Sequence, residues 1–382
     1  MDESLPSLRD DRLMRAPHPV RAREAGPVLF DDLRRSMGPD RFEAFQRHVR
    51  QHEDHFTSDV VQGAFEAVGM REIYYALREV SGGPSAGSNG TGNASVIETT
   101  IRSLIAPPAH FLVDDDLVRV LLATEIDEDI PMRFLVPGQS RLFIEFGRRR
   151  DLDVTLLNEA TGAHVLEGAY VETTAAIGGA GTPDDPDRIL KVVLTGSPIG
   201  KSHALDDAVF SFVLPCDDPD LPLHDAMDAA VRNARRIEAG HTPIPPHAWE
   251  NAREALHLLV KALLYVSMSS ARREFSREYS EAQARLAAIR SGSKLAKARR
   301  QLRGLRDHIL ILPPAQEAGD ANVLPSGTHH RTVGTHWRRW HFRLQRHGKG
   351  NSLVKVVLIR QVLVNPAAGA PSPQPRSYRA QL

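Results

Sequence analysis

The residues best suited to chemistry lie together near the C-terminus, at His336, Trp337, Arg338, Arg339 and His341. A histidine metal site usually has a second ligand at helical i, i+4 spacing or a cysteine nearby. Neither accompanies these histidines, and the alternation of a strand would place His336 and His341 on opposite faces. We therefore expect no metal and no cofactor, and we interpret the histidines as exposed or phosphate-contacting side chains.

Three other stretches carry residue types that could support catalysis or nucleotide binding. Residues 196–202 (GSPIGKS) resemble a phosphate-binding loop, but three residues separate the glycines instead of four, and a strand-like run follows. The acidic groups 114–116 and 125–129 adjoin apolar runs, which is typical of helix caps and solvated ends. The sole cysteine, Cys216, has acidic neighbours that would raise its pKa. We therefore assign no catalytic residue and expect a protein that is not an enzyme.

Arginines interleaved with aromatic residues favour a binding function near the C-terminus. Residues 336–345 and 353–364 alternate with period two, and the glycine-containing stretch 346–351 between them predicts a β-hairpin. The alternation predicts two unlike faces on the first strand. The apolar face is formed by Trp340, Phe342 and Leu344, and the basic face by Arg339, His341, Arg343 and Gln345.

Such a ribbon could stack on bases and pair with phosphates, or it could bind an acidic protein surface. The alternative is an ordinary edge hairpin that its charges keep soluble. If the ribbon binds, we expect the contacts to come from His336, Trp337, Arg338, Arg339, His341, Arg343, Arg346, Lys349 and Lys355.

The distribution of charge separates the C-terminal part from the rest. The whole chain has 48 Lys and Arg against 48 Asp and Glu. Residues 291–382 carry 16 Lys and Arg against three Asp and Glu, whereas residues 1–290 carry 32 against 45. The chain is thus an acidic body with a basic end. Such an end either attracts phosphate or an acidic partner, or docks on the body and neutralises it.

The elements that position these residues follow from periodicity. Apolar residues at helical spacing predict helices over 29–37, 40–52 and 58–80, before a Gly- and Ser-rich linker. From residue 131 the period is that of antiparallel hairpins. The expected strand pairs are 132–136 with 141–146, 153–157 with 164–173, and 189–195 with 208–214.

Helices return after the strands. We expect helices over 223–239 and 248–270, the second burying a stripe of Ala255, Leu256, Leu259, Leu263 and Val266. A helix over 276–290, a solvated basic helix over 294–306 and a short strand over 307–312 complete the order.

Together these patterns predict an α+β fold with N-terminal helices, a central antiparallel sheet with a long helix, and a basic C-terminal β-hairpin. The expected organisation is an N-terminal helical region at 1–80, a linker at 81–96, an α+β body at 97–290, a basic region with the hairpin at 291–365, and a disordered tail at 366–382.

Composition narrows the class of protein. The chain is 41% hydrophobic and 25% charged, which is ordinary for a protein with a packed core. No run of 18 apolar residues predicts a membrane span, and the charged N-terminus does not resemble a secretory signal. We expect a cytoplasmic protein with no membrane partner, and the sequence does not indicate its oligomeric state.

A motif near the C-terminus resembles the type V-A anti-CRISPR family typified by the second such protein described. The motif is a Gly, a His-Trp pair, a second aromatic, a Gly-rich turn, a basic strand and a closing Val-x-Val-Asn. It is formed here by Gly334, His336, Trp337, Trp340, Gly348, Gly350, Asn351, Lys355, Val362, Val364 and Asn365. The order of the preceding elements is similar from about residue 130, including Gly168-Ala-Tyr170, but only the last 35 residues of the resemblance are specific.

The sequence departs from this family pattern at named positions. Thr335 separates Gly334 from His336, Ser140-Arg141 stands where the family has Trp-Cys, and Gln361 replaces a frequent proline.

The resemblance implies inhibition without catalysis. The archetype lowers production of the type V-A Cas effector nuclease by recognising the N-terminal region of the effector as it is made and triggering loss of its message. The implied partners are the nascent Cas effector, its mRNA and the ribosome. Two alternatives remain: a general RNA- or DNA-binding protein of a mobile element, and a ribonuclease that uses His336 or His341.

Overall fold

The computed structural model describes residues 16–51, 58–69, 107–135, 139, 141–147, 152–158, 162–175, 188–197, 208–238, 244–290, 292–302, 304–315 and 336–364. The expected linker at 81–96, the turn at 137–140, most of the glycine-rich stretch 196–202 and the tail at 366–382 lie wholly or largely outside these residues.

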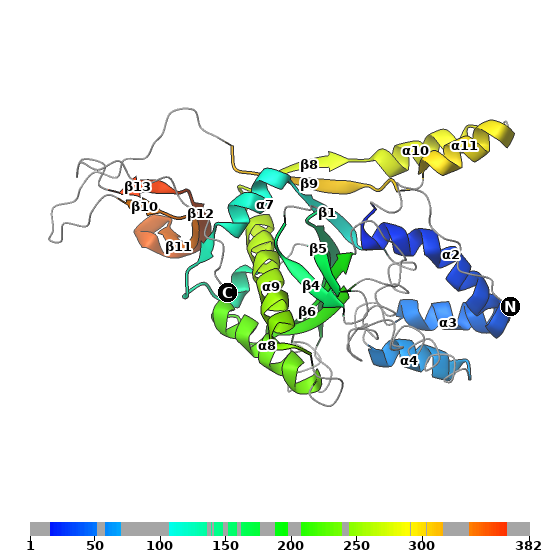
Figure 1. Cartoon of the computed structure of the whole chain (residues 1–382), viewed down its shortest axis with the longest axis horizontal. Coiled ribbons are helices and arrows are strands. Elements are labelled where there is room, and N and C mark those ends of the chain that lie inside the picture. The colour runs from blue at the N-terminus through cyan, green and yellow to red at the C-terminus, as the bar shows by residue number, and fades with distance from the viewer. Residues whose placement is uncertain are drawn as a thin grey trace.

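An eight-stranded sheet forms the centre of the molecule (Figure 1). Its order is β7-β6-β5-β3-β1-β9-β8, and β4 pairs with β5 off this path. The strands are β1 Ala109–Val113, β3 Arg141–Glu145, β4 Thr155–Asn158, β5 Gly162–Ala175, β6 Arg188–Ser197, β7 Ala208–Pro215, β8 Arg272–Ser276 and β9 His308–Leu312. The predicted α+β class is confirmed.

Two details differ from the sequence-based prediction. The sheet is mixed, because β1 pairs parallel with both β3 and β9, whereas we expected only antiparallel pairs. Residues 132–135, the described part of the expected strand 132–136, do not form a strand. Met132–Phe134 is a short 3-10 helix, η2, in which the amides of Phe134 and Leu135 donate to the carbonyls of Pro131 and Met132. The amides of Met132 and Arg133 donate to the carbonyls of Leu221 and Pro219 rather than to a neighbour in the eight-stranded sheet.

Two helices cover one face of the sheet (Figure 1). They are α8, Leu223–Glu238, and α9, Pro246–Ser267. The five residues of the predicted stripe on α9 are all buried in the main core, with Leu142, Ile144 and Val171 of the sheet. This helix is the predicted long helix, and burying its apolar face against the sheet supplies much of the core.

The opposite face of the sheet carries charged side chains that are buried by helix α2, His18–Met37. Arg21 of α2 forms a bidentate ion pair with Glu167 of β5, and both side chains are fully buried. His18 Nδ1 lies 2.8 Å from the hydroxyl of Tyr170. Unpaired charges would be costly in such a place, so these pairs fix where α2 docks.

The N-terminal region continues as a small helical group. Helices α3, Pro39–Gln51, and α4, Ser58–Ala67, pack through Phe45 and Phe65, whose ring centroids are 4.8 Å apart. The predicted helices over 29–37 and 40–52 are present, although α2 begins earlier, at His18. The helix predicted over 58–80 is too long, because α4 ends at Ala67 and residues 68–69 form a turn in which Gly69 has a φ of 72°. Residues 70–80 lie outside the described part.

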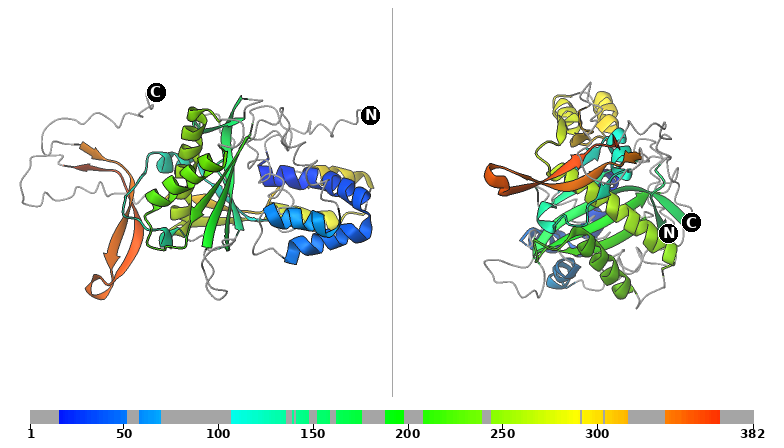
Figure 2. Two further views of the ribbon diagram at one scale, coloured as in Figure 1. Left: turned by 90° about the horizontal axis from the view of Figure 1, so that it is seen from below. Right: turned by 90° about the vertical axis from the view of Figure 1, so that its left-hand side faces the viewer.

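Strands β8 and β9 lead into a helical arm formed by α10, Glu278–Ala287, and α11, Gly292–Leu302 (Figure 1). The arm lies beside α2 at the end of the molecule away from the C-terminal strands (Figure 2). The guanidinium of Arg23 lies 4.2 Å from the ring centroid of Tyr279 and donates to the carbonyl of Leu305.

The remaining strands form two smaller sheets. β10, His336–Arg338, pairs with β13, Val362–Val364. β11, His341–His347, pairs with β12, Leu353–Ile359, and with β2, Glu125–Ile126. Between β2 and β3 lies η2, and between β1 and β2 lies α7, Asp115–Leu122. Among the described residues, no helix is long and apolar enough to cross a membrane.

Candidate partner-binding hairpin

The predicted C-terminal hairpin is present, and its register is unbroken. His336 lies opposite Val364, and His341 lies opposite Ile359, so both strands advance by five positions and the same register holds in both paired segments. Pairing is interrupted in the middle, where the first strand passes from β10 to β11. At the tip, Gly348 and Gly350 have φ of 79° and 66°, as a turn of this kind requires. The 3-10 turn η3, Lys349–Asn351, closes the hairpin.

One face of the hairpin joins the main core. Phe342 is fully buried, and Val356 is also buried in the core shared with the sheet and α9. Leu344 and Leu358 pack partly against the same core. The predicted apolar face is therefore correct, although Trp340 lies just before β11 and is only half-buried.

Strand β2 attaches the hairpin to the body. The amide of Glu125 donates to the carbonyl of Trp340 at 2.9 Å, and the amide of Asp127 donates to the carbonyl of Phe342 at 3.0 Å. The side chain of Arg339 pairs with Glu125 at 2.9 Å, with both side chains well exposed. The acidic group 125–129 thus includes a contact to the basic end, while Asp114 caps α7 as expected.

His341 does not lie on an exposed basic face, and this part of the prediction is wrong. Its side chain is 4% exposed, and its Nδ1 lies 3.0 Å from the carbonyl of Arg339. Alternation assigned the correct face, but it could not reveal that this face is covered near the body. Arg343, two residues further along, is half-buried.

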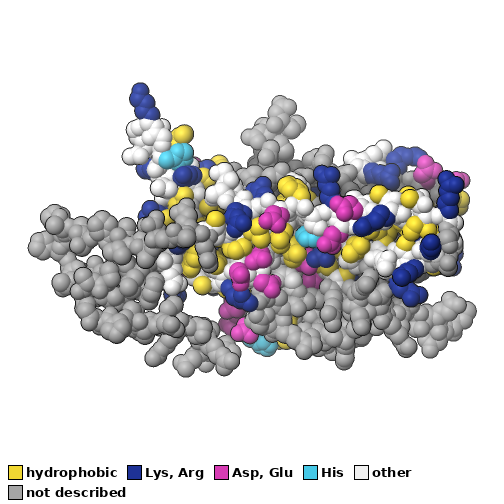
Figure 3. Space-filling view, turned by 90° about the horizontal axis from the view of Figure 1, so that it is seen from above, with side chains coloured by type: hydrophobic (Ala, Val, Ile, Leu, Met, Phe, Trp, Pro, Cys, Tyr) yellow, Lys and Arg dark blue, Asp and Glu magenta, His cyan; other side chains and the backbone are white. Residues whose placement is uncertain are grey.

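The exposed cations gather toward the tip instead. Arg346, Lys349 and Lys355 are exposed, and Gln345 lies opposite Lys355. Arg346 shares the face of Phe342, whereas Lys355 lies on the other face, so the tip is cationic on both sides. Figure 3 shows this end standing clear of the body, with dark blue, cyan and yellow side chains on it. Leu353 in this region is 55% exposed.

The first three candidate residues lie further from the tip. His336, Trp337 and Arg338 form β10, and their backbones pair with β13, but their side chains lie outside the described part of the structure. Of the residues predicted to act together, the structure brings Arg346, Lys349 and Lys355 to one end. It leaves Arg339 at the base, paired with Glu125.

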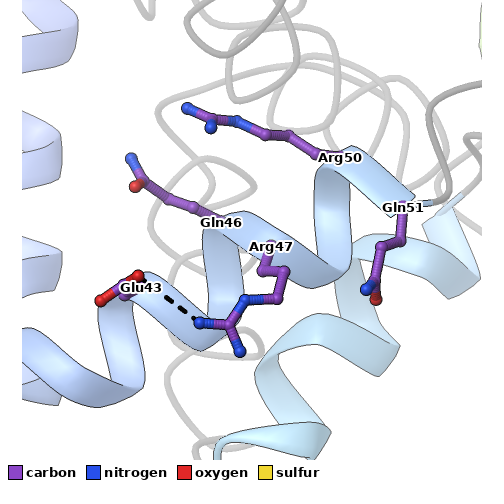
Figure 4. Close-up of a pocket in the computed structure, with 5 residues that line it drawn as sticks. All are labelled: Glu43, Gln46, Arg47, Arg50 and Gln51. Carbon is purple, nitrogen blue, oxygen red and sulfur yellow. Dashed lines mark hydrogen bonds and ion pairs between the residues drawn. The ribbon is translucent and has the colours of Figure 1, made fainter.

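The described residues offer little else in the way of a small-molecule site. They contain no group of three or more His, Cys, Asp or Glu placed to hold a metal ion. The hollow on α3 in Figure 4 is lined by Glu43, Gln46, Arg47, Arg50 and Gln51, all from one helix, and its ion pair joins Glu43 to Arg47 at 3.5 Å. An open surface with one exposed ion pair does not enclose a ligand.

Comparison with known families decides the assignment. Residues 111–366 match the model of the AcrVA2-like family, described as the anti-CRISPR type V subtype A2 family. The chain belongs to this family. The match begins inside β1 and runs past β13, so it covers the sheet, α8, α9, the arm and the hairpin. No curated protein matches the chain.

The resemblance expected from the C-terminal motif is thereby confirmed, and it extends well beyond the last 35 residues. The structure explains glycines of the resemblance in this anti-CRISPR-type protein, two in the C-terminal motif and one in the preceding elements. Gly348 and Gly350 have positive φ at the hairpin tip. Gly168 lies against Phe143 and the carbonyl of Ile144, where a side chain would collide with both.

Sequence reasoning missed the partners that hold the hairpin in place. Ile126 pairs with Phe342, and Glu125 pairs with Arg339, yet both lie more than 200 residues earlier in the chain. β2 has only two residues, which is too short to show an alternating pattern. The one signal was the acidic group itself, whose charge is opposite to that of the hairpin.

Proposed function

We propose that this protein lowers production of a type V-A CRISPR effector by binding the nascent effector polypeptide, its mRNA, or both, through the tip of the C-terminal hairpin. Membership of the anti-CRISPR type V subtype A2 family is the observation that carries the proposal. The exposed cations of the tip support the choice of surface, because binding a polymer needs an accessible, charged and firmly held element.

The attachment of the hairpin favours recognition at low entropic cost. Phe342 is fully buried and the β2 contacts hold the base, so the strands need not be ordered when a partner binds. An extended peptide or RNA strand could then lie along the tip, with Arg346, Lys349 and Lys355 pairing with carboxylates or phosphates.

In the described part of the structure, the exposed cations of the tip form no ion pair with acidic residues of the body. Among the described residues, Arg339 is the hairpin cation with an acidic partner, Glu125. This arrangement favours an external partner over the alternative in which the basic end simply neutralises the body. General nucleic-acid binding would use the same tip. It differs in predicting that the production of any encoded protein falls, whether or not the message encodes the effector.

A translation assay tests the proposal. A translating lysate receives equal amounts of two messages, one encoding a type V-A effector and one encoding an unrelated nuclease, with or without the purified protein. We expect the full-length effector and its message to fall while the control product is unchanged. Replacing Arg346, Lys349 and Lys355 together by Gln should remove the effect. An equal fall in both products would instead indicate general nucleic-acid binding, and no fall in either would contradict the proposal.

A further inference from the structure

A second cationic surface lies on the arm formed by α10 and α11. Between Arg285 and Arg306 the sequence has eight Lys and Arg and no Asp or Glu. Six of these cations are exposed, namely Arg285, Arg290, Lys294, Lys297, Arg299 and Arg300. Figure 3 shows dark blue side chains gathered over this end of the molecule. The surface is remote from the hairpin, because the sheet and its covering helices lie between them (Figure 2).

The fold leaves these cations exposed on the surface of the arm. Leu295, Ala298 and Leu302 form a half-buried stripe on α11, which packs beside α10. The cations of α11 occupy the remaining directions around the helix. Within the described ranges, no ion pair involves any of the six exposed cations, whereas Arg306 at the foot of the arm pairs with Glu145 at 2.6 Å.

The arm is held in place by contacts that do not use its exposed cations. Arg23 of α2 contacts both Tyr279 and the carbonyl of Leu305, and the Arg306 pair joins the foot of the arm to β3. Strand β8 pairs with β9 over five residues. The cationic surface is therefore presented by an anchored element, and its charges remain available.

We propose that the α10–α11 arm is an RNA-binding surface that contacts the phosphate backbone without reading sequence. Phosphate binding needs only accessible Lys and Arg. A protein interface usually also needs a buried apolar or aromatic anchor. The large apolar side chains exposed in the described part of the chain are Leu122, Val213, Phe275 and Leu353, and none lies on α10 or α11. The choice of RNA over DNA rests on the proposed function, which places the protein at a translated message.

The test measures binding of the full-length protein to a fluorescein-labelled single-stranded RNA by fluorescence anisotropy. The arm variant carries Lys294→Gln, Lys297→Gln, Arg299→Gln and Arg300→Gln. Four phosphate contacts predict that wild-type affinity falls about 50-fold between roughly 50 and 200 mM salt. The arm variant should lose most of this dependence and bind at least about ten-fold more weakly at the lower salt.

A matched control removes the same charge from elsewhere on the surface. It carries Arg119→Gln, Arg133→Gln, Arg232→Gln and Arg253→Gln, of which three are ion-paired with Asp116, Asp220 and Asp228. This control should bind RNA like the wild type, and thermal melts should show all proteins folded. A second comparison, Arg346→Gln with Lys349→Gln and Lys355→Gln, separates the arm from the hairpin tip: it should keep most RNA affinity even if it loses the translation effect.

Four results would overturn the inference. They are no RNA binding by the wild type at low salt, equal binding by the arm variant, equal losses in the arm variant and the matched control, and a preference for polyglutamate over RNA. Duplex DNA of the same length serves as the competing source of phosphate, and tighter binding to it would contradict the choice of RNA. Arm-dependent RNA binding by a protein that does not affect effector production would refute the proposed function while leaving the arm as a binding surface.

Discussion

Phe342 in β11 lies directly opposite Ile126 in β2, and this parallel pair joins the C-terminal hairpin to the sheet body. The relationship spans more than 200 residues of sequence. It places the covered base of the hairpin in the core and leaves the cationic tip in solvent. The base and the tip should therefore respond differently to substitution.

Replacing Phe342 by Ala should destabilise the protein by about 3–5 kcal/mol, because a fully buried phenyl ring leaves a cavity in the shared core. Urea unfolding measures the change. Leu353→Ala provides the control within the same hairpin, since Leu353 is 55% exposed and its loss should cost about 0.5 kcal/mol or less. Equal losses of stability would show that the hairpin base is not part of the core.

Gly168→Ala should be strongly destabilising although it adds one methyl group. A Cβ at this position would lie 2.4 Å from the carbonyl oxygen of Ile144 and 2.6 Å from the Phe143 ring, and backbone atoms cannot easily move aside. We expect a cost of about 3 kcal/mol. Gly292→Ala is the control, because a Cβ there meets nothing within 4 Å at the start of α11. That variant should be neutral or slightly more stable, and a neutral Gly168→Ala would contradict the packing described.

Arg21→Met should destabilise the protein by about 3–5 kcal/mol, because it leaves the carboxylate of Glu167 buried without its guanidinium. The double variant with Glu167→Met should recover much of this loss, since no unpaired charge then remains. Arg47→Met is the matched control: its pair with Glu43 is exposed, and the change should stay within about 0.5 kcal/mol. If Arg21→Met alone is as stable as the double variant, the ion pair does not determine where α2 docks.

Periodicity predicted the elements that are long and have one buried face. The stripe of α9, the hairpins of β4 to β7 and the C-terminal hairpin were predicted because each repeats its pattern over several turns or residues. β1 and β8 were not predicted, and neither was the parallel pairing of β1, since pairing between distant strands leaves no local signal. The burial of His341 was missed for the same reason. Alternation assigns a face, but the covering of that face depends on the rest of the fold.

Stability should fall as the pH drops below about 6.5, partly because of His257. Burial, followed by the nearby charges of Arg253 and Lys261, lowers the pKa of His257 to about 4. Between pH 4 and 6.5 the unfolded chain therefore binds more protons than the folded one, and stability rises with pH in that window. From pH 7 to pH 5 the contribution is roughly 2 kcal/mol. Urea unfolding at both pH values should show a smaller loss for His257→Gln than for the wild type, and equal losses would contradict this assignment.

Substitutions at the hairpin tip should leave the stability of the protein nearly unchanged and should weaken the proposed binding. Arg346→Gln, Lys349→Gln and Lys355→Gln remove exposed cations, so each should change the free energy of unfolding by no more than about 0.5 kcal/mol. A triple variant that unfolds much earlier than the wild type would mean that the tip is a structural element.

The most direct measurement is the affinity of the protein for ribosomes stalled with the N-terminal segment of a type V-A effector emerging from the exit tunnel. Identical ribosomes that carry an unrelated nascent chain serve as the reference. The proposed function predicts tighter binding to the effector complex by the wild type, and loss of that difference in the triple tip variant with its fold intact. Equal affinity of the wild type for both complexes, or an undiminished preference in the tip variant, would contradict it.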